Sequence, residues 1–207
     1  MSDSFAPILA GLGLGIALAG APGPVQAILL TEALRGGVRR GLRAMAGANL
    51  MLGALLLALA LGVSIAVPGG PVLRILKILG GAFLIFLAVD GFRTASRPIA
   101  NAPRRDELPP AARGALAVIL NPPAWLFLAT AASSLMVSAT QAGGTLTAVL
   151  AALALLVGVM AGDGTLVLAS GLGLRRARSD VGRILRQVLS LVLAVLGAAL
   201  VLSGVLP

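Results

Sequence analysis

Apolar residues run along this chain in long stretches that short polar segments separate. Each stretch is close to the roughly 20 residues that an α-helix needs to cross the hydrocarbon core of a membrane. We expect six such stretches, at about 5–30, 44–67, 75–92, 115–137, 145–170 and 188–206. The pattern predicts an all-α polytopic membrane protein with six transmembrane helices.

The composition supports a single transmembrane domain over residues 1–207. Of the 207 residues, 58% are hydrophobic and 11% charged, and the mean hydropathy is +1.04. A soluble domain of this length needs far more polar surface. The chain has no cysteine and no histidine, which argues against thiol chemistry, hydrolase triads and the commonest zinc sites. With no nucleotide-binding fingerprint either, we expect no enzyme, no cofactor and no metal.

The positive charge of the chain predicts its orientation. The net charge of +9 would suggest nucleic acid in a soluble protein, but the basic residues lie between apolar stretches and aromatics are only 3% of the residues. Fourteen of the sixteen lie in the first–second, third–fourth and fifth–sixth connections, against Arg74 and Lys77 elsewhere. The positive-inside rule then places these connections in the cytoplasm and both termini outside, with the lipid bilayer as partner and no nucleic acid.

Prolines interrupt two of the apolar stretches, at Gly20-Ala21-Pro22-Gly23-Pro24 and at Asn121-Pro122-Pro123. A proline inside a helix costs roughly 3 kcal/mol because it removes a backbone donor and crowds a carbonyl. In hydrocarbon such a break is tolerated only where it is buried in protein or lines a wet cavity. Each break is therefore a candidate binding site.

The proline-rich segment 94–113 reads as a cytoplasmic linker between two three-helix halves. The first half covers about 1–97 and the second about 113–207. Since three crossings are an odd number, the second half enters the membrane from the opposite side. The halves then form an inverted repeat whose first and fourth helices are broken, an architecture common in transporters. The alternative is two unrelated kinks.

Counting about 1.5 Å per residue along the helices places both breaks, Asp163, Gln26 and Asn49 in one layer of the membrane, between the midplane and the cytoplasmic surface. Asp163 is the expected site for charge or coupling. The expected substrate-binding residues are Pro22, Gly23, Pro24, Val25, Gln26, Asn49, Asn121, Pro122 and Ala124.

Each break also predicts a helix N-terminus with unpaired amides, which suits an anion. If Pro24 begins one helix, the amides of residues 25–27 lack partners within it. If Asn121 caps another that begins at Pro122, the amides of Ala124 and Trp125 are free. With Asp163 receiving an ammonium group or a proton, the site would suit a small zwitterion such as an amino acid.

Structural roles for these polar residues stay open. Asp163 can be satisfied by backbone or by a loop arginine, although carboxylates inside membranes are functional by default. Gln26 and Asn49 can serve only as hydrogen-bond donors between helices. Asn121 caps its helix in either case, and Trp125 is interpreted as packing.

Two further features have structural interpretations. Glu32 and Asp90 are expected to form surface ion pairs at cytoplasmic helix ends, near Arg35 and Arg93. Small residues recur at spacings that let helices approach closely. Packing within one chain is the preferred explanation, and a homodimer stays open; the glycines are Gly11, Gly13, Gly15, Gly47, Gly53, Gly80, Gly81, Gly158 and Gly162.

The stretch PGPVQAILLTEALRGGVRRGLRAMAGANLMLG resembles the lysine exporter (LysE-type) superfamily, including its homoserine and threonine efflux branch. The matching positions are Pro22, Gly23, Pro24, Arg35, Gly36, Gly41, Gly47 and Gly53. LNPPAWLFLAT is similar to the family's Asn-Pro-Lys motif at Asn121 and Pro122. Pro123 stands where many members have lysine, so no charge role is transferred to it, and Asp163 corresponds to no family motif.

The resemblance implies export of amino acids or similar small metabolites from the bacterial cytoplasm across the inner membrane. The driving force would be a proton gradient or the membrane potential. We expect a secondary transporter that works by alternating access. Two alternatives remain, an inorganic cation efflux carrier and a membrane subunit that transports nothing, and a membrane enzyme ranks below both.

Overall fold

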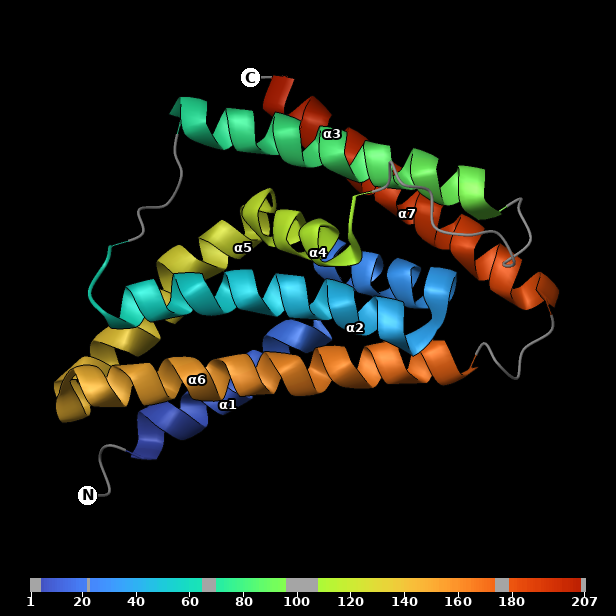
Figure 1. Cartoon of the computed structure of the whole chain (residues 1–207). Coiled ribbons are helices and arrows are strands. Elements are labelled where there is room, and N and C mark those ends of the chain that lie inside the picture. The colour runs from blue at the N-terminus through green and yellow to red at the C-terminus, as the bar shows by residue number, and fades with distance from the viewer. Residues whose placement is uncertain (1–4, 22, 65–69, 96–107, 174–178, 206–207) are drawn as a thin grey trace.

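The computed structural model describes residues 5–21, 23–64, 70–95, 108–173 and 179–205, and all secondary structure in these ranges is helical. This confirms the all-α class for the described residues (Figure 1). The elements are α1 (Phe5–Gly20), α2 (Pro24–Ala60), α3 (Gly70–Ala95), α4 (Pro110–Ile119), α5 (Pro122–Phe127), the π-helical turn η1 (Leu128–Ala132), α6 (Ser133–Gly173) and α7 (Ser179–Val205).

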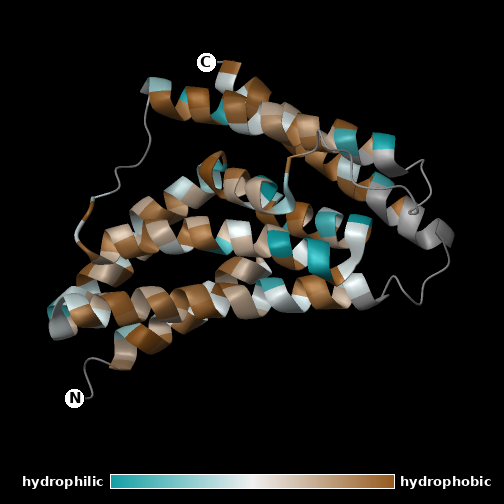
Figure 2. Ribbon diagram, viewed as in Figure 1, coloured by the Kyte–Doolittle hydropathy of each residue, from teal (hydrophilic) through white to brown (hydrophobic). Residues whose placement is uncertain are grey.

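Four helical runs are long and apolar enough to cross a membrane. Two more apolar helices, α1 and α4, are too short to cross alone, but each is followed directly by a break and a further helix. Hydrophobic residues cover most of the helices, and hydrophilic ones gather toward one end of the bundle (Figure 2). The four long runs are Pro24–Ala60, Gly70–Asp90, Pro122–Gly171 and Gln187–Val205.

Paired glycines bend both long helices back on themselves. In α2, Gly36 has φ −139° and ψ 20°, and Gly37 has φ 73° and ψ −173°. In α6, Gly143 has φ −167° and ψ 27°, and Gly144 has φ 72° and ψ −170°. The chain reverses direction at each bend (Figure 1), and the positive φ at the second glycine favours a residue without Cβ. We call the parts before and after each bend the first and second arms.

Several helices extend beyond the stretches predicted for them. Helix continues from Pro24 to the Gly36–Gly37 bend and resumes directly after it, so the connection expected between 30 and 44 is helical apart from a glycine turn. The predicted linker 94–113 overlaps helices at both ends, because α3 extends to Ala95 and α4 begins at Pro110. Arg113 therefore lies in a helix; residues 96–107 are outside the described part of the chain.

Both predicted breaks are present, and a proline begins the helix after each one. α1 ends at Gly20 and α2 begins at Pro24, while α4 ends at Ile119 and α5 begins at Pro122. Trp125 does more than pack, since its indole Nε1 donates to the Ile119 carbonyl at 2.7 Å. This bond satisfies one of the carbonyls that the second break leaves without a helical partner.

The helices pack in a regular pattern: α1 lies on α6, α4 on α2, α3 on α7, and α2 on α6. Glycines allow the backbones to touch. A Cβ on Gly47 would lie 1.9 Å from the Ala111 carbonyl oxygen, and one on Gly15 would lie 2.0 Å from that of Leu155. Packing within the chain is confirmed for the predicted glycines except Gly13, whose Cβ position has no atom of the described ranges within 4 Å. These contacts bring the two breaks into the interior.

Candidate functional site

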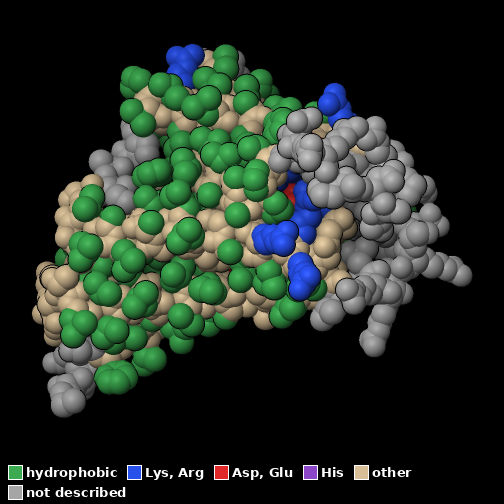
Figure 3. Space-filling view, in the orientation of Figure 1, with side chains coloured by type: hydrophobic (Ala, Val, Ile, Leu, Met, Phe, Trp, Pro, Cys, Tyr) green, Lys and Arg blue, Asp and Glu red, His purple; other side chains and the backbone are tan. Residues whose placement is uncertain are grey.

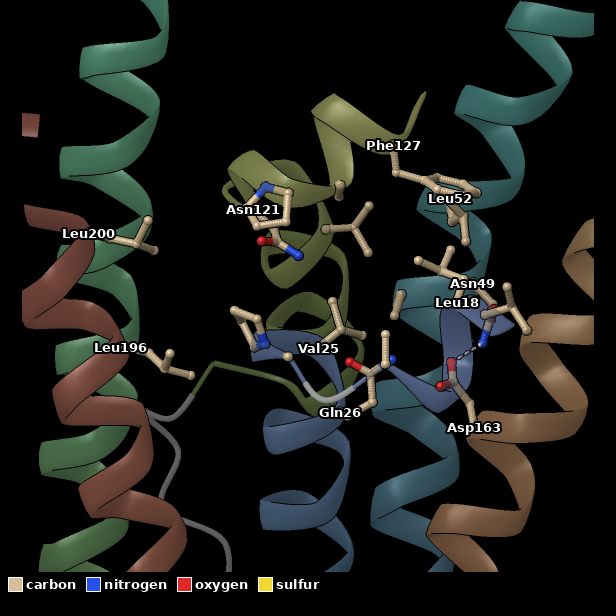
Figure 4. Close-up of a pocket in the computed structure, with 18 residues that line it drawn as sticks. Leu18, Val25, Gln26, Asn49, Leu52, Asn121, Phe127, Asp163, Leu196 and Leu200 are labelled. Carbon is tan, nitrogen blue, oxygen red and sulfur yellow. Dashed lines mark hydrogen bonds between the residues drawn. The ribbon is translucent and has the colours of Figure 1, made fainter. Parts of the chain in front are cut away.

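The two breaks line one cavity of about 330 Å³ (Figure 4). Helices α1, α2, α4, α5, α6 and α7 all contribute residues to it, so segments far apart in sequence meet at this cavity. The predicted site residues that line the cavity are Gly23, Pro24, Val25, Gln26, Asn49, Asn121, Ala124 and Asp163. Pro122 is buried but does not line it, whereas Pro123 does, and Pro22 lies outside the described residues.

Asp163 is a carboxylate enclosed in protein, with 2% of the residue exposed. Asn49 Nδ2 donates to its Oδ2 at 3.4 Å and also to the Met45 carbonyl at 3.1 Å. No arginine among the described residues pairs with Asp163, and its Oδ1 has no hydrogen-bond partner there. Since a buried ionised carboxylate needs compensation, this site favours a proton or a cationic group.

Asn121 sits at the break between α4 and α5, but its side chain does not cap the helix. The side chain makes no capping bond, and its Oδ1 is buried without a partner among the described residues. The Oδ1 of Asn49 is in the same condition. In Figure 4, Asn121 and Asp163 lie on different sides of the cavity, with Val25 and Gln26 between them. Unsatisfied buried acceptors of this kind suit hydrogen-bond donors on a ligand.

The predicted anion site at the second break is wrong. The amides of Ala124 and Trp125 both donate to the Asn121 carbonyl, at 3.0 and 3.4 Å. Prolines occupy the two preceding positions and carry no N–H. At the first break the Ala27 amide is also used, donating to the Gly23 carbonyl at 3.0 Å. That leaves the amides of Val25 and Gln26, in the first turn of α2, without carbonyl partners in their own helix.

Most of the cavity wall is apolar, and hydropathy gave no means of finding it. The additional side chains include Leu52 and Phe127 on one side and Leu196 and Leu200 of α7 on another (Figure 4). On a helix that is apolar all round, the sequence does not indicate whether an apolar residue faces the cavity, another helix or lipid. Val159, one helical turn before Asp163, is the exception, because the i, i+4 spacing places both on one face.

The acidic residues Glu32 and Asp90 are not surface pairs. The Glu32 side chain is 1% exposed and contacts three arginines of α2 and α4. Asp90 pairs with Arg35 at 2.8 Å and Arg113 at 2.7 Å, whereas Arg93, the expected neighbour, is exposed. That Arg113 pairs with these acids was not predicted from the sequence, because Arg113 was assigned to the linker.

Comparison with known proteins agrees with the motifs. The family model of LysE type translocators matches residues 16–204, which include both breaks and Asp163. The chain belongs to the LysE type translocator family. No curated protein and no solved structure gives a significant match. Family membership and the apolar helices make this LysE type translocator a multi-pass membrane protein and a transporter rather than an enzyme.

Proposed function

We propose that this LysE type translocator exports amino acids or similar small metabolites, with the cavity between the two helix breaks as its binding site. The observation that carries the proposal is the cavity itself, about 330 Å³ in volume, into which both breaks, Asp163 and Asn121 converge. Sites for small molecules span roughly 300–1,000 Å³, so this one suits a ligand of few heavy atoms.

The chemistry of the lining supports an amine-bearing ligand. Asp163 would receive the ammonium group, with Asn49 holding the carboxylate in place. The amides of Val25 and Gln26, at the positive end of the α2 dipole, are the remaining candidates for a carboxylate. The apolar wall, including Leu196 and Phe127, would enclose the rest of the molecule.

We further propose that the chain crosses the membrane six times as an inverted repeat. The repeated dihedral angles at Gly36–Gly37 and Gly143–Gly144 support this topology. So does the packing, because exchanging the halves converts the contact of α1 with α6 into that of α4 with α2. The contacts of α3 with α7 and of α2 with α6 map onto themselves. Alternating access would arise as one half rocks against the other, driven by protons or membrane potential.

The arginines support an inner-membrane orientation with the Gly36–Gly37 bend in the cytoplasm. Arg39 and Arg43 beside this bend and Arg93 at the end of α3 are all exposed. In Figure 3 most of the basic side chains on the face shown gather at one end, a separate basic patch lies at the top of the view, and hydrophobic side chains cover most of the rest. The positive-inside rule then places both termini outside the cytoplasm.

The proposal is tested by counterflow in proteoliposomes loaded with each common amino acid in turn. At least one should exchange faster than in liposomes without protein. Asp163→Asn should lower that rate at least about tenfold, because hydrogen bonds to charged groups contribute roughly 1.5–3 kcal/mol. The control is Thr165→Val, since this exposed hydroxyl donates to the Gly162 carbonyl of its own helix and to no other group of the described residues. Equal rates in wild type and Asp163→Asn would remove Asp163 from the mechanism.

An inorganic cation carrier is the nearest alternative, and measuring the flux of metal salts distinguishes it from an amino-acid exporter. The described residues contain no group of three acidic, histidine or cysteine side chains that could hold a metal ion. Flux of metal salts, with no exchange of any amino acid, would favour that alternative. A chain that carries neither class would be a subunit without transport activity.

A further inference from the structure

Two acidic and three basic side chains form a buried ion network between α2, α3 and α4. Arg113 NH1 lies 3.2 Å from Glu32 Oε1 and 2.7 Å from Asp90 Oδ2. Arg35 NH1 lies 2.8 Å from the same Asp90 oxygen and 3.6 Å from Glu32 Oε1. Arg40, beyond the glycine bend, donates to Glu32 Oε2. The acids thus hold together the first arm of α2, the end of α3 and the start of α4.

The network is far more enclosed than ion pairs at helix ends usually are. The side chains of Glu32 and Arg113 are each 1% exposed, and that of Arg35 is 6% exposed. The free energy of removing charges from water can exceed the free energy that their attraction supplies. Apolar residues of similar size in the same place often stabilise a protein more. Stability alone is therefore a poor explanation for five charges at this position. A contact that must form and separate is a better one.

The position of the network relative to the cavity indicates what it controls. Glu32 follows Pro24 by eight residues, and Arg113 precedes Asn121 by eight residues. At 1.5 Å per residue, each lies about 12 Å along its helix from a break. Both helices run between the cavity and the end of the bundle where the arginine-rich bend lies. The pair of Glu32 and Arg113 therefore joins the two broken helices on that side of the site.

We propose that this ion network is the gate between the central cavity and the arginine-rich side of the protein. In the proposed inverted repeat, Glu32 and Asp90 belong to the first half and Arg113 to the second, so both Arg113 pairs cross between the halves. Rocking one half against the other would separate these pairs and open the site to this side. A zwitterion would find both charges there, with Arg113 for its carboxylate and Glu32 for its ammonium group. The gate rests on the proposed transport function.

The chain contains no cysteine, so access through the gate can be measured without background labelling. Val118→Cys places one thiol in the cavity wall, on α4 between Arg113 and the break. Arg39→Cys, in a separate protein, identifies the arginine-rich side because Arg39 is exposed beside the bend. The rate of labelling by a bulky, membrane-impermeant maleimide is then compared from each side of sealed vesicles.

With the network intact, Val118→Cys should label slowly from the side at which Arg39→Cys labels fast. Adding Glu32→Gln should raise that rate at least about tenfold, corresponding to about 1.4 kcal/mol in the opening equilibrium. Arg113→Lys keeps the charge but loses the planar fork, so it should give a smaller increase and serves if Glu32→Gln does not fold. Arg43→Gln, at an exposed arginine beside the same bend, is the control and should change nothing.

Equal labelling rates in the intact protein, the folded network variants and the control would overturn the gate. So would an increase confined to the opposite side of the membrane. The labelling needs no transported molecule, so the gate and the transport function can fail separately. Faster labelling without any counterflow would keep the gate and reject the proposed substrate class.

Discussion

Asn49 and Asp163 stand 114 residues apart in the sequence, and the Asn49 amide donates to the Asp163 carboxylate across the wall of the central cavity at 3.4 Å. The contact joins the second arm of α2 to the second arm of α6. Within the described part of the chain, the Asp163 Oδ1 and the Asn49 Oδ1 have no hydrogen-bond partner.

Asp163→Asn should leave stability unchanged or raise it. The carboxylate is 2% exposed and pairs with no arginine among the described residues, so the substitution removes the burial of a charge and breaks no ion pair. The midpoint of thermal unfolding in detergent measures this. A structural role for the carboxylate predicts instead a clear fall in the midpoint. Such a fall would count against Asp163 as a ligand-binding group.

Asn49→Leu should weaken ligand binding through Asp163. It keeps the approximate volume but removes the donor that orients the carboxylate. Because the two residues share one hydrogen bond, their effects on affinity should be coupled by about 0.5–3 kcal/mol. The check is a double-mutant cycle of dissociation constants for wild type, Asn49→Leu, Asp163→Asn and the double variant. Additive effects would show that the two side chains act independently.

Gly47→Val should destabilise the protein by about 1–3 kcal/mol, the usual range for overpacking. Its Cβ would meet the Ala111 backbone, which cannot move aside as a side chain can. The matched control is Gly13→Ala on the open face of α1, where the higher helix propensity of alanine should stabilise by up to about 1 kcal/mol. Thermal midpoints compare the two. Equal effects would contradict the close contact of α2 with α4.

Gly37→Ala and Gly144→Ala should each cost about 1–2 kcal/mol, and the two costs should be similar. Gly37 has φ +73° and Gly144 has φ +72°, and no atom of the described residues lies within 4 Å of either Cβ position, so the penalty comes from the backbone alone. Unfolding midpoints of the single variants give the comparison. A penalty at one bend and none at the other would argue against equivalent turns in the two halves.

Hydropathy and proline placement predicted the all-α class and both breaks, and they singled out Asn121, Asp163 and Gln26, which line one cavity. These follow from rules that need only position along a helix. The free amides at Ala124 and Trp125 were wrong because the Asn121 carbonyl accepts from both, a local geometry that the proline signal does not reveal. The predicted Asn121 side-chain cap and the predicted surface ion pairs of Glu32 and Asp90 were also wrong, because they too depend on local geometry that the sequence pattern does not reveal.

The ion network could not be predicted, because it depends on which helix ends meet. Glu32 and Arg113 lie 81 residues apart, and a charge near the end of an apolar stretch looks the same whether it faces water or another helix. Arg113 was also missed because the prolines of segment 94–113 were interpreted as a linker, although Pro110 occupies the first position of α4. The apolar cavity wall was missed because Leu196 and Leu200 resemble residues that face lipid.

Thermal unfolding of the purified protein against a panel of common amino acids tests the binding site most directly. A ligand at about 100 times its dissociation constant stabilises the folded state by about 2.7 kcal/mol. We predict that at least one zwitterionic amino acid raises the unfolding midpoint of the wild-type protein, and that Asp163→Asn abolishes this shift. No shift with any amino acid, or the same shift in wild type and Asp163→Asn, would contradict a site formed by the two breaks and Asp163.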